Sequence, residues 1–183
     1  MEHSQRSDAA LARAARLGDV EAFAAIVDRH GPVMRRYARF ILGDDDDASD
    51  ATQDALVSAW RGLDSFRGDS ALRTWLFTLV SRRAADLQRR RRPLPVSDED
   101  LEQHLESVSD PALGGALEDE LVVALQSALP ELPWHQRACW LLREIEGLSY
   151  DEIATALGIT PDRVRGYLHR GREALARRME AWR

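Results

Sequence analysis

Only one cysteine, Cys139, occurs among the 183 residues, and it lies within the apolar stretch ACWLL. A single cysteine excludes an internal disulfide and any zinc site built from several cysteines. Its apolar neighbours indicate a buried structural thiol rather than a nucleophile. No apolar run approaches the roughly 20 residues that a membrane-spanning helix needs, and the N-terminal residues lack the apolar core of a signal peptide. We therefore expect a cytoplasmic protein.

Lysine is absent as well, so all 25 residues of the lysine and arginine class are arginine. Arginine binds phosphate through paired hydrogen bonds and stacks on bases, which suits nucleic acid. The codon bias of a GC-rich genome produces the same composition, and we take that bias to explain most of the missing lysine. The length allows one domain or two small ones.

The net charge is −6, but the charges are unevenly distributed along the chain. Residues 73–92 contain seven arginines and one acidic residue, whereas residues 93–136 contain ten acidic residues and no arginine. Nine arginines and seven acidic residues follow, and six of these arginines lie between Arg163 and Arg178. Screening over about 8 Å keeps such patches electrically separate. The sequence therefore predicts two basic surfaces separated by an acidic spacer.

Apolar residues recur at helical spacing without the alternation typical of β-strands, so we predict an all-α protein of two small domains. Residues 8–92 are expected to form the first helical domain, with a helix that should kink or restart at Pro32. Residues 93–116 carry two prolines near their start and two glycines near their end, and they are acidic and poor in large apolar groups. They predict a flexible acidic linker. Residues 117–183 are expected to form the second domain.

Two short helices joined by a tight turn are predicted within GLSYDEIATALGITPDRVRGYLHRGR, residues 147–172. Ser149 and Glu152 fit a capping box at the start of the first helix, and Gly158 permits the left-handed backbone that often ends a helix. Thr160 fits the N-cap of the second helix, which begins with a proline and carries several arginines. This pattern is typical of a helix-turn-helix that enters a DNA major groove. The alternative is a helical hairpin with a solvated basic face; we favour DNA binding because capping, turn and charge agree.

The helix predicted over residues 73–92 is a second candidate for nucleic-acid binding. Trp75 and Phe77 lie near its start and Phe66 precedes it, and aromatic rings beside arginine suit single-stranded or melted DNA. In the alternative, Trp75 belongs to the core and the arginines form a solvated helix end. We place Trp75 in the core and the arginines on phosphate, because seven arginines beside one acid repel one another unless anions offset them.

Nothing in the sequence indicates an enzyme. A glycine-rich phosphate loop, a metal-ligand cluster and a nucleophile triad are all missing, and the five histidines are scattered along the chain. We therefore expect no catalytic residue, no cofactor, no metal and no small-molecule substrate.

Three blocks, in this order, resemble the extracytoplasmic-function (ECF) group of bacterial sigma factors. They are AFAAIVDRHGPVMRRYARFILG, then DASDATQDALVSAWRGLDSFRGDSALRTWLFTLVSRRAADLQRRRR, then LPELPWHQRACWLLREIEGLSYDEIATALGITPDRVRGYLHRGREAL. The group has only the second and fourth conserved domains of the larger family, joined by a linker. The resemblance implies an alternative sigma factor that binds core RNA polymerase and directs promoter recognition, promoter melting and transcription initiation.

The resemblance also implies roles for individual residues. Docking on the β′ clamp helices of core polymerase would use Asp50, Gln53, Asp54 and Trp60. The minus-ten element would be bound by Phe66, Arg73, Thr74, Arg82, Arg83, Arg89 and Arg90. The minus-thirty-five element would be bound by Arg163, Arg165, Tyr167, His169, Arg170 and Arg172. Further partners would be the β flap of polymerase and an anti-sigma factor, and the acidic linker would follow the polymerase's RNA path.

Four positions depart from the common pattern of the group. Arg82 stands where asparagine is common, Gly166 and Tyr167 stand where serine and arginine are common, and Gly171 stands where alanine is common. The promoter sequence of a relative therefore cannot be transferred to this chain. A stand-alone helix-turn-helix regulator is the alternative function, although no part of the sequence resembles a phosphoacceptor receiver domain.

Overall fold

The computed structural model describes residues 6–68, 70–91, 125 and 127–180. By its internal contacts the chain forms two compact units, one built mainly from residues up to Arg91 and the other mainly from residues beyond it. Each unit is described by itself. The predicted linker over residues 93–116 and the expected start of the second domain at residue 117 lie outside the described residues.

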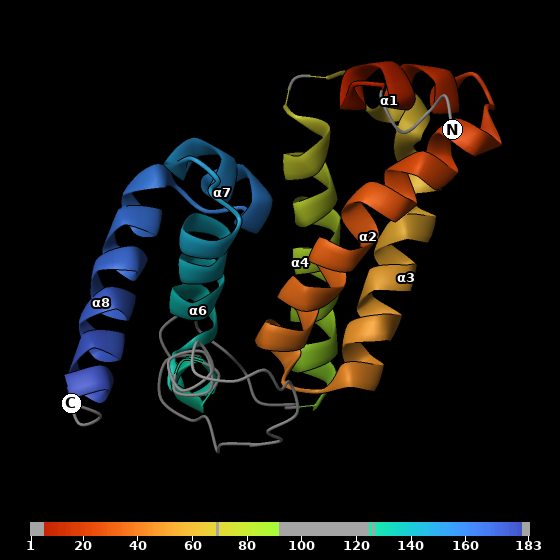
Figure 1. Cartoon of the computed structure of the whole chain (residues 1–183). Coiled ribbons are helices and arrows are strands. Elements are labelled where there is room, and N and C mark those ends of the chain that lie inside the picture. Colours follow the sequence, from red (N-terminus) through yellow and green to blue (C-terminus); the bar gives the residue numbers. More distant parts are fainter. Residues whose placement is uncertain (1–5, 69, 92–124, 126, 181–183) are drawn as a thin grey trace. The chain divides into compact units, whose positions relative to one another are not determined.

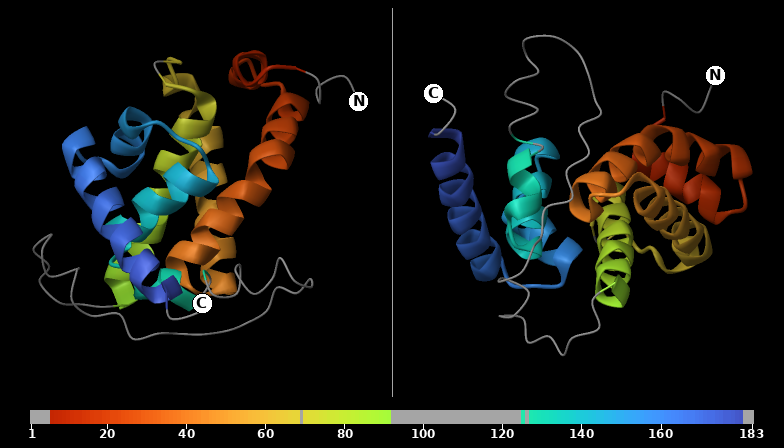
Figure 2. Two further views of the ribbon diagram at one scale, coloured as in Figure 1. Left: turned by 60° about the vertical axis from the view of Figure 1, so that its left-hand side comes forward. Right: turned by 90° about the horizontal axis from the view of Figure 1, so that it is seen from below.

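Every regular element of the described residues is helical, which confirms the predicted all-α class. The first unit contains α1 (Asp8–Arg16), α2 (Val20–Leu42), α3 (Asp45–Gly62), the 3-10 helix η2 (Leu63–Ser65) and α4 (Leu72–Arg91). Helices α2, α3 and α4 lie side by side with alternating direction, and α1 lies across the end where α2 begins (Figure 1; Figure 2). None of the described helices is long and apolar enough to span a membrane.

Local sequence signals explain where these helices begin and end. The side chains of Ser7, Asp19 and Asp44 accept hydrogen bonds from backbone N–H groups three residues later, which caps α1, α2 and α3. Gly43 ends α2 in the left-handed conformation at φ 71°. The acidic run Asp45–Asp47 occupies the first turn of α3, where carboxylates interact favourably with the helix dipole.

Of the kink or restart expected at Pro32, the restart is wrong, because α2 continues through this residue as one helix. Proline removes one backbone hydrogen bond and costs about 3 kcal/mol inside a helix. Packing on both sides offsets this cost, since Ile26 and Met34, which flank the proline, are fully buried. Tertiary contacts therefore override the local signal of the proline.

Small and aromatic residues pack the core of the first unit. The buried face of α3 is formed by Ala48, Ala51, Ala55 and Ala59, and such small side chains let neighbouring helices approach closely. Between α2 and α4, the Tyr37 hydroxyl lies 2.9 Å from the Ser81 hydroxyl. The Tyr37 ring also meets the edge of Phe77 at 5.4 Å between centroids.

The second unit contains the 3-10 helix η4 (Leu129–Glu131), α6 (Trp134–Trp140), the π-helical segment η5 (Leu141–Ile145), α7 (Tyr150–Leu157) and α8 (Pro161–Glu180). The π-helical segment η5 directly follows α6, so the helix continues through residue 145 with a wider last turn. Cys139 is fully buried, and burial raises the pKa of its thiol to about 12. The prediction of a structural thiol is consistent with this, since a nucleophilic cysteine needs a lowered pKa.

Candidate nucleic-acid interface

The predicted helix-turn-helix is formed by α7 and α8. The Ser149 N–H donates to Glu152 Oε2 at 2.8 Å, and the Glu152 N–H donates to Ser149 Oγ at 3.3 Å, which completes the capping box. Gly158 takes the left-handed conformation at φ +68° between the helices. Thr160 Oγ1 accepts a hydrogen bond from the Arg163 N–H at 3.3 Å, and α8 begins at Pro161. Each local prediction for this motif is confirmed.

One face of α8 is packed and the other carries charge. Val164, Leu168 and Leu175 are buried, which fixes the orientation of the helix on its own unit. The predicted minus-thirty-five residues on the exposed side are Arg163, Arg165, His169, Arg170 and Arg172. A helix whose apolar stripe is buried and whose first turns are basic has the form needed to enter a major groove.

Carboxylates lie close to several of these basic side chains. Arg165 Nη1 donates to Asp162 Oδ1 at 2.6 Å, and His169 Nε2 lies 3.6 Å from Glu173 Oε1. Arg172 Nε donates to Glu144 Oε1 of η5 at 3.1 Å, and this hydrogen bond raises the pKa of the Arg172 guanidinium. These pairs are largely solvent-exposed, so they contribute little to stability.

Tyr167 differs from the other predicted DNA-binding residues of α8 because it is buried. Its side chain is only 4% exposed. The ring stacks on His135 of α6, with centroids 5.1 Å apart and planes 11° from parallel, and the Arg170 Cζ lies 5.0 Å from the Tyr167 centroid. Tyr167 is therefore covered by neighbouring side chains and does not present its ring to the exposed face.

The predicted minus-ten residues are spread over the loop before α4 and along α4 itself. Phe66 is half-buried against Trp75, with ring centroids 4.9 Å apart. Arg73 lies with its Cζ 5.6 Å from the Phe77 centroid, whereas Thr74 is buried and 1% exposed. Thr74 is therefore enclosed in the unit, unlike the other members of this set.

The remaining arginines of this set lie further along α4. Arg82, Arg89 and Arg90 are exposed, and Arg89 pairs with Asp86 on the same helix. Arg83 is half-buried and its Nη2 lies 2.6 Å from Asp54 Oδ2 on α3. This ion pair joins the predicted minus-ten set to the predicted polymerase-binding set, which the sequence did not indicate.

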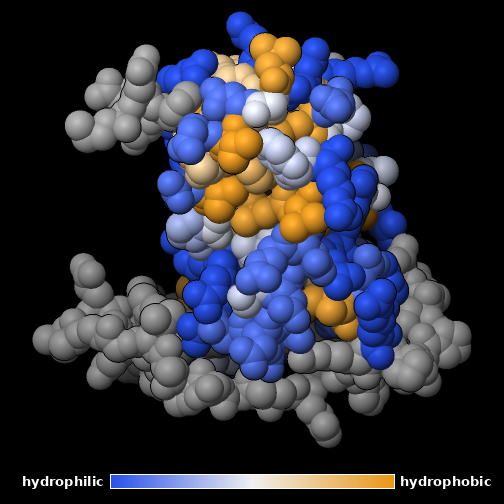
Figure 3. All heavy atoms as spheres, turned by 90° about the vertical axis from the view of Figure 1, so that its right-hand side faces the viewer, coloured by the Kyte–Doolittle hydropathy of each residue, from blue (hydrophilic) through white to orange (hydrophobic). Residues whose placement is uncertain are grey.

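The predicted polymerase-binding residues Asp50, Gln53, Asp54 and Trp60 are all exposed along α3. Trp60 is 41% exposed and meets the Phe23 ring of α2 at 4.9 Å between centroids. Sequence reasoning missed three other exposed apolar residues of this unit: Val57 on α3, Val20 at the start of α2 and Leu17 before it. Apolar side chains gather on this side of the unit (Figure 3). Such exposed apolar groups mark interaction surfaces, and helical spacing of Val57 with Trp60 was the available signal.

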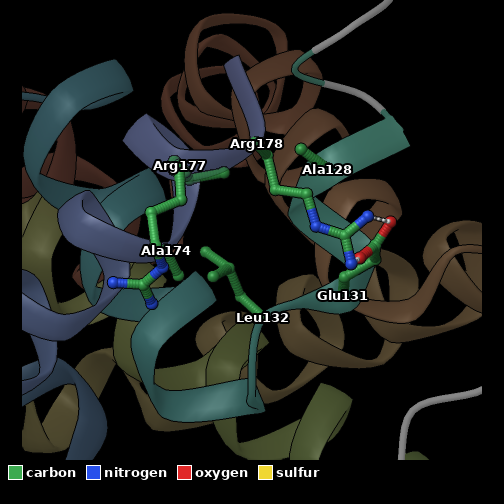
Figure 4. A pocket seen from close by; sticks show the side chains of 7 residues that line it. Ala128, Glu131, Leu132, Ala174, Arg177 and Arg178 are labelled. Carbon is green, nitrogen blue, oxygen red and sulfur yellow. Dashed lines mark hydrogen bonds and ion pairs between the residues drawn. The ribbon is translucent and has the colours of Figure 1, made fainter. Parts of the chain in front are cut away.

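A small hollow lies between η4 and the last turns of α8. Arg178 and Glu131 form an ion pair beside it, and Leu132 and Ala174 face its interior (Figure 4). This ion pair joins the C-terminal half of α8 to η4. Packing and this ion pair therefore hold α8, including its basic N-terminal half, in place along most of its length.

Models of two known protein families match the chain, one in each unit. The model of Sigma-70 region 2 matches residues 26–93, and the model of Sigma-70 region 4 matches residues 123–175. The fold and the basic helix-turn-helix thus define a sigma-70 type transcription protein with two of the conserved regions.

Similarity to individual proteins identifies the family within this class. The chain is 36% identical over 173 residues to the ECF RNA polymerase sigma factor SigM of Mycobacterium tuberculosis, covering 94% of this chain and 85% of SigM. The structure of CnrH in complex with the cytosolic domain of CnrY matches with a TM-score of 0.71 and 30% identity, covering 95% of this chain and 97% of that one. The sigma factor RpoE in complex with the anti-sigma factor NepR, from Bartonella quintana, matches with a TM-score of 0.70 and 27% identity, covering 88% and 98%. The chain belongs to the ECF family of RNA polymerase sigma factors.

Proposed function

We propose that this chain, an alternative sigma factor that directs transcription initiation, does so by holding promoter DNA at two separate basic surfaces while bound to core RNA polymerase. The observation that carries the proposal is the doubly capped helix-turn-helix whose second helix exposes Arg163 and Arg165 in its first turns. Residues 8–92 would form the region 2 domain, residues 93–116 the acidic linker and residues 117–183 the region 4 domain. The polymerase supplies the chemistry of RNA synthesis, so we assign this chain no catalytic role and expect it to act in the cytoplasm.

Core polymerase would dock on the exposed side of α3. Asp50, Gln53 and Asp54 offer polar and acidic groups, and Trp60 with Val57 offers apolar area beside them. Aromatic residues surrounded by polar groups are typical of the strongest contacts in protein interfaces. We assign this surface to the β′ clamp helices, and we assign the second unit to the β flap.

The minus-ten element would be held by the loop before α4 and by the arginines of α4. Phe66, half-buried against Trp75, offers a ring on which a base of the melted strand can stack. Arg73, Arg82, Arg83, Arg89 and Arg90 would contact phosphates, which position the strand without reading its sequence. Thr74 is buried, so we propose that it supports the start of α4 rather than touching DNA.

The minus-thirty-five element would be read by the N-terminal half of α8 in the major groove. Arg163 and Arg165 are best placed for base edges, because they lie in the first turns of the helix. His169, Arg170 and Arg172 lie further along and would contact the backbone. An anti-sigma factor is a further proposed partner, by similarity to the RpoE–NepR complex.

The proposal is tested by transcription with purified components. Core RNA polymerase, the full chain and a library of promoter fragments are mixed, and run-off transcripts are sequenced to identify the promoters used. We expect transcripts only with the complete mixture. The free chain should bind DNA weakly, because the acidic linker competes with DNA for the basic surfaces. Tight binding by the free chain without any initiation would instead indicate the stand-alone regulator.

Arg165→Ala should weaken binding of the holoenzyme to the minus-thirty-five element selected in this way by about 1–3 kcal/mol and relax the preference at one base position. Binding is measured by fluorescence anisotropy on the selected element and on variants that each carry one changed base pair. Arg177→Ala removes the same charge from the last turn of α8 and serves as the control. An equal loss on every sequence would make Arg165 a phosphate contact only.

A further inference from the structure

Arg170 lies on a stack of rings contributed by two helices. Its Cζ is 5.0 Å from the Tyr167 centroid, and Tyr167 stacks almost parallel on His135 at 5.1 Å. His135 in turn meets the Trp134 ring nearly edge-on at 4.8 Å and 88°. His135 and Trp134 belong to α6. Arg170 belongs to α8 and is exposed.

The Arg170 guanidinium lies beside Gly166. A Cβ at residue 166 would stand 3.5 Å from Arg170 Nη1, an ordinary van der Waals contact, so the guanidinium reaches back by one helical turn over this position without requiring glycine there. Gly166 and Tyr167 are two of the positions expected, from the resemblance to the ECF group, to differ from the common pattern. The structure places both beside Arg170: residue 166 lies next to the guanidinium, and Tyr167 supplies the flat surface beneath it.

The Arg170 side chain points back along α8 toward the N-terminal turns of the helix. Arg170 follows Arg163 by seven residues, which places the two side chains on nearly the same side of an α-helix. Reaching back toward residue 166 brings the guanidinium closer to the basic N-terminal half of the helix. An arginine held over a ring keeps its charge while losing side-chain freedom before DNA arrives.

We propose that Tyr167, supported by His135, is a positioning residue that holds the Arg170 guanidinium ready for a phosphate of the minus-thirty-five DNA. Tyr167 then acts on DNA through Arg170 and does not contact a base itself. This inference rests on the proposed function, because it concerns the same helix and the same DNA. It replaces the direct DNA contact that sequence reasoning assigned to Tyr167.

The test is a set of double-mutant cycles in the holoenzyme, using the promoter fragment selected by run-off transcription. The variants are Tyr167→Leu, Tyr167→Phe, Arg170→Ala and Arg172→Ala, alone and in pairs, and affinity is measured at several salt concentrations. Arg172 is the matched control: it loses the same charge on the same helix, but Glu144 holds it instead of the stack.

We expect Arg170→Ala to lower affinity about tenfold, as for one lost contact to a charged group. Tyr167→Leu should give a loss of similar size in the parent chain and less than about twofold in the Arg170→Ala background. Tyr167→Phe should retain the affinity of the parent, since the ring is kept. Both Tyr167→Leu and Arg170→Ala should reduce the salt slope by up to about 0.9, the value for one phosphate contact.

An equal loss from Tyr167→Leu in the parent and Arg170→Ala backgrounds would overturn the positioning role, and so would coupling of the same size to Arg172→Ala. Circular dichroism checks that each variant folds, and His135→Leu, which removes the supporting ring from another helix, replaces Tyr167→Leu if that variant unfolds. Absence of any promoter-dependent transcript from the parent holoenzyme would remove the proposed function and this inference together. Normal transcription with additive cycles would remove this inference alone.

Discussion

At the scale of single residues, glycines set the shape of the helix-turn-helix in different ways. Gly158 adopts a left-handed conformation that other residues rarely take, and it makes the turn between α7 and α8 possible. Gly171 lies within α8 in ordinary helical conformation, and a Cβ there would stand 3.5 Å from the Gln136 carbonyl oxygen. That distance is a normal van der Waals contact. Gly171 is therefore not required by backbone geometry, and glycine inside a helix costs about 1 kcal/mol relative to alanine.

Gly171→Ala should raise the free energy of unfolding of the second unit by up to about 1 kcal/mol. Gly158→Ala, the contrasting variant, should lower it by about 1–2 kcal/mol, because its backbone is left-handed. Hydrogen exchange of the amides in α6 and α8 measures both changes within this unit. Destabilisation by Gly171→Ala would mean that the contact with Gln136 cannot take the added methyl group.

At the scale of elements, charged side chains anchor α1 on α2. Asp8, in the first turn of α1, accepts a hydrogen bond from Arg29 Nη1 at 2.6 Å and lies 3.0 Å from His30 Nε2. Arg29 also donates to the Arg6 carbonyl oxygen at 2.9 Å. Partial burial acts to raise the pKa of Asp8, but the hydrogen bond from Arg29 and the interaction with His30 outweigh it, so the pKa is lowered.

Asp8→Asn should lower the free energy of unfolding of the first unit near neutral pH. A carboxylate with a lowered pKa favours the folded state above its ordinary value of 3.8, and this contribution is lost as pH falls through the lower pKa of the folded protein. The difference between Asp8→Asn and the parent should therefore be constant near neutral pH and shrink below 3.8. Urea unfolding of the variant and the parent at a series of pH values measures this difference in the free energy of unfolding.

Asp28→Asn provides the comparison for this experiment, since Asp28 is exposed on the same helix, α2. A similar loss of stability in both variants at neutral pH would indicate a general effect of charge on α2. A loss that persists unchanged in acid would contradict the role of the ionised Asp8 carboxylate.

At the scale of the whole molecule, the proposed functions are divided between two compact units. The basic residues lie mainly in two groups, over residues 73–92 and 163–178, and residues 93–136 between them contain ten acidic residues and no arginine. The proposed docking surface on α3 is separate from most of the arginines of α4, although Arg83 and Asp54 connect them. Apart from this ion pair, changes at the two proposed surfaces should weaken polymerase binding and DNA binding separately.

Gln53→Ala combined with Asp54→Ala should weaken binding to core polymerase by about tenfold or more if this surface holds central contacts. The isolated chain should keep its circular dichroism spectrum, because both side chains are exposed. Biolayer interferometry with immobilised core enzyme measures the affinity, and Asp28→Ala, outside the surface, is the control. Unchanged affinity would remove α3 from the proposed interface.

Much of the fold and part of the site could be predicted from the sequence. Caps such as Ser149 with Glu152, the turn at Gly158 and the apolar stripe of Val164 and Leu168 follow from neighbours within one or two helical turns. The exposed arginines of α4 and α8 were also predicted. What could not be predicted depends on contacts between residues distant in the sequence, such as the continuation of α2 through Pro32.

The sequence by itself therefore determined the helical class, the helix-turn-helix and the separation of basic from acidic segments, because propensity, capping and charge are local properties. Only the tertiary structure decided which members of the predicted sites are buried. Thr74 and Tyr167 are enclosed, and Arg170 lies over a ring that stacks on His135 of another helix. The physical reason is that burial and side-chain direction depend on how helices pack, and packing joins residues that the sequence keeps far apart.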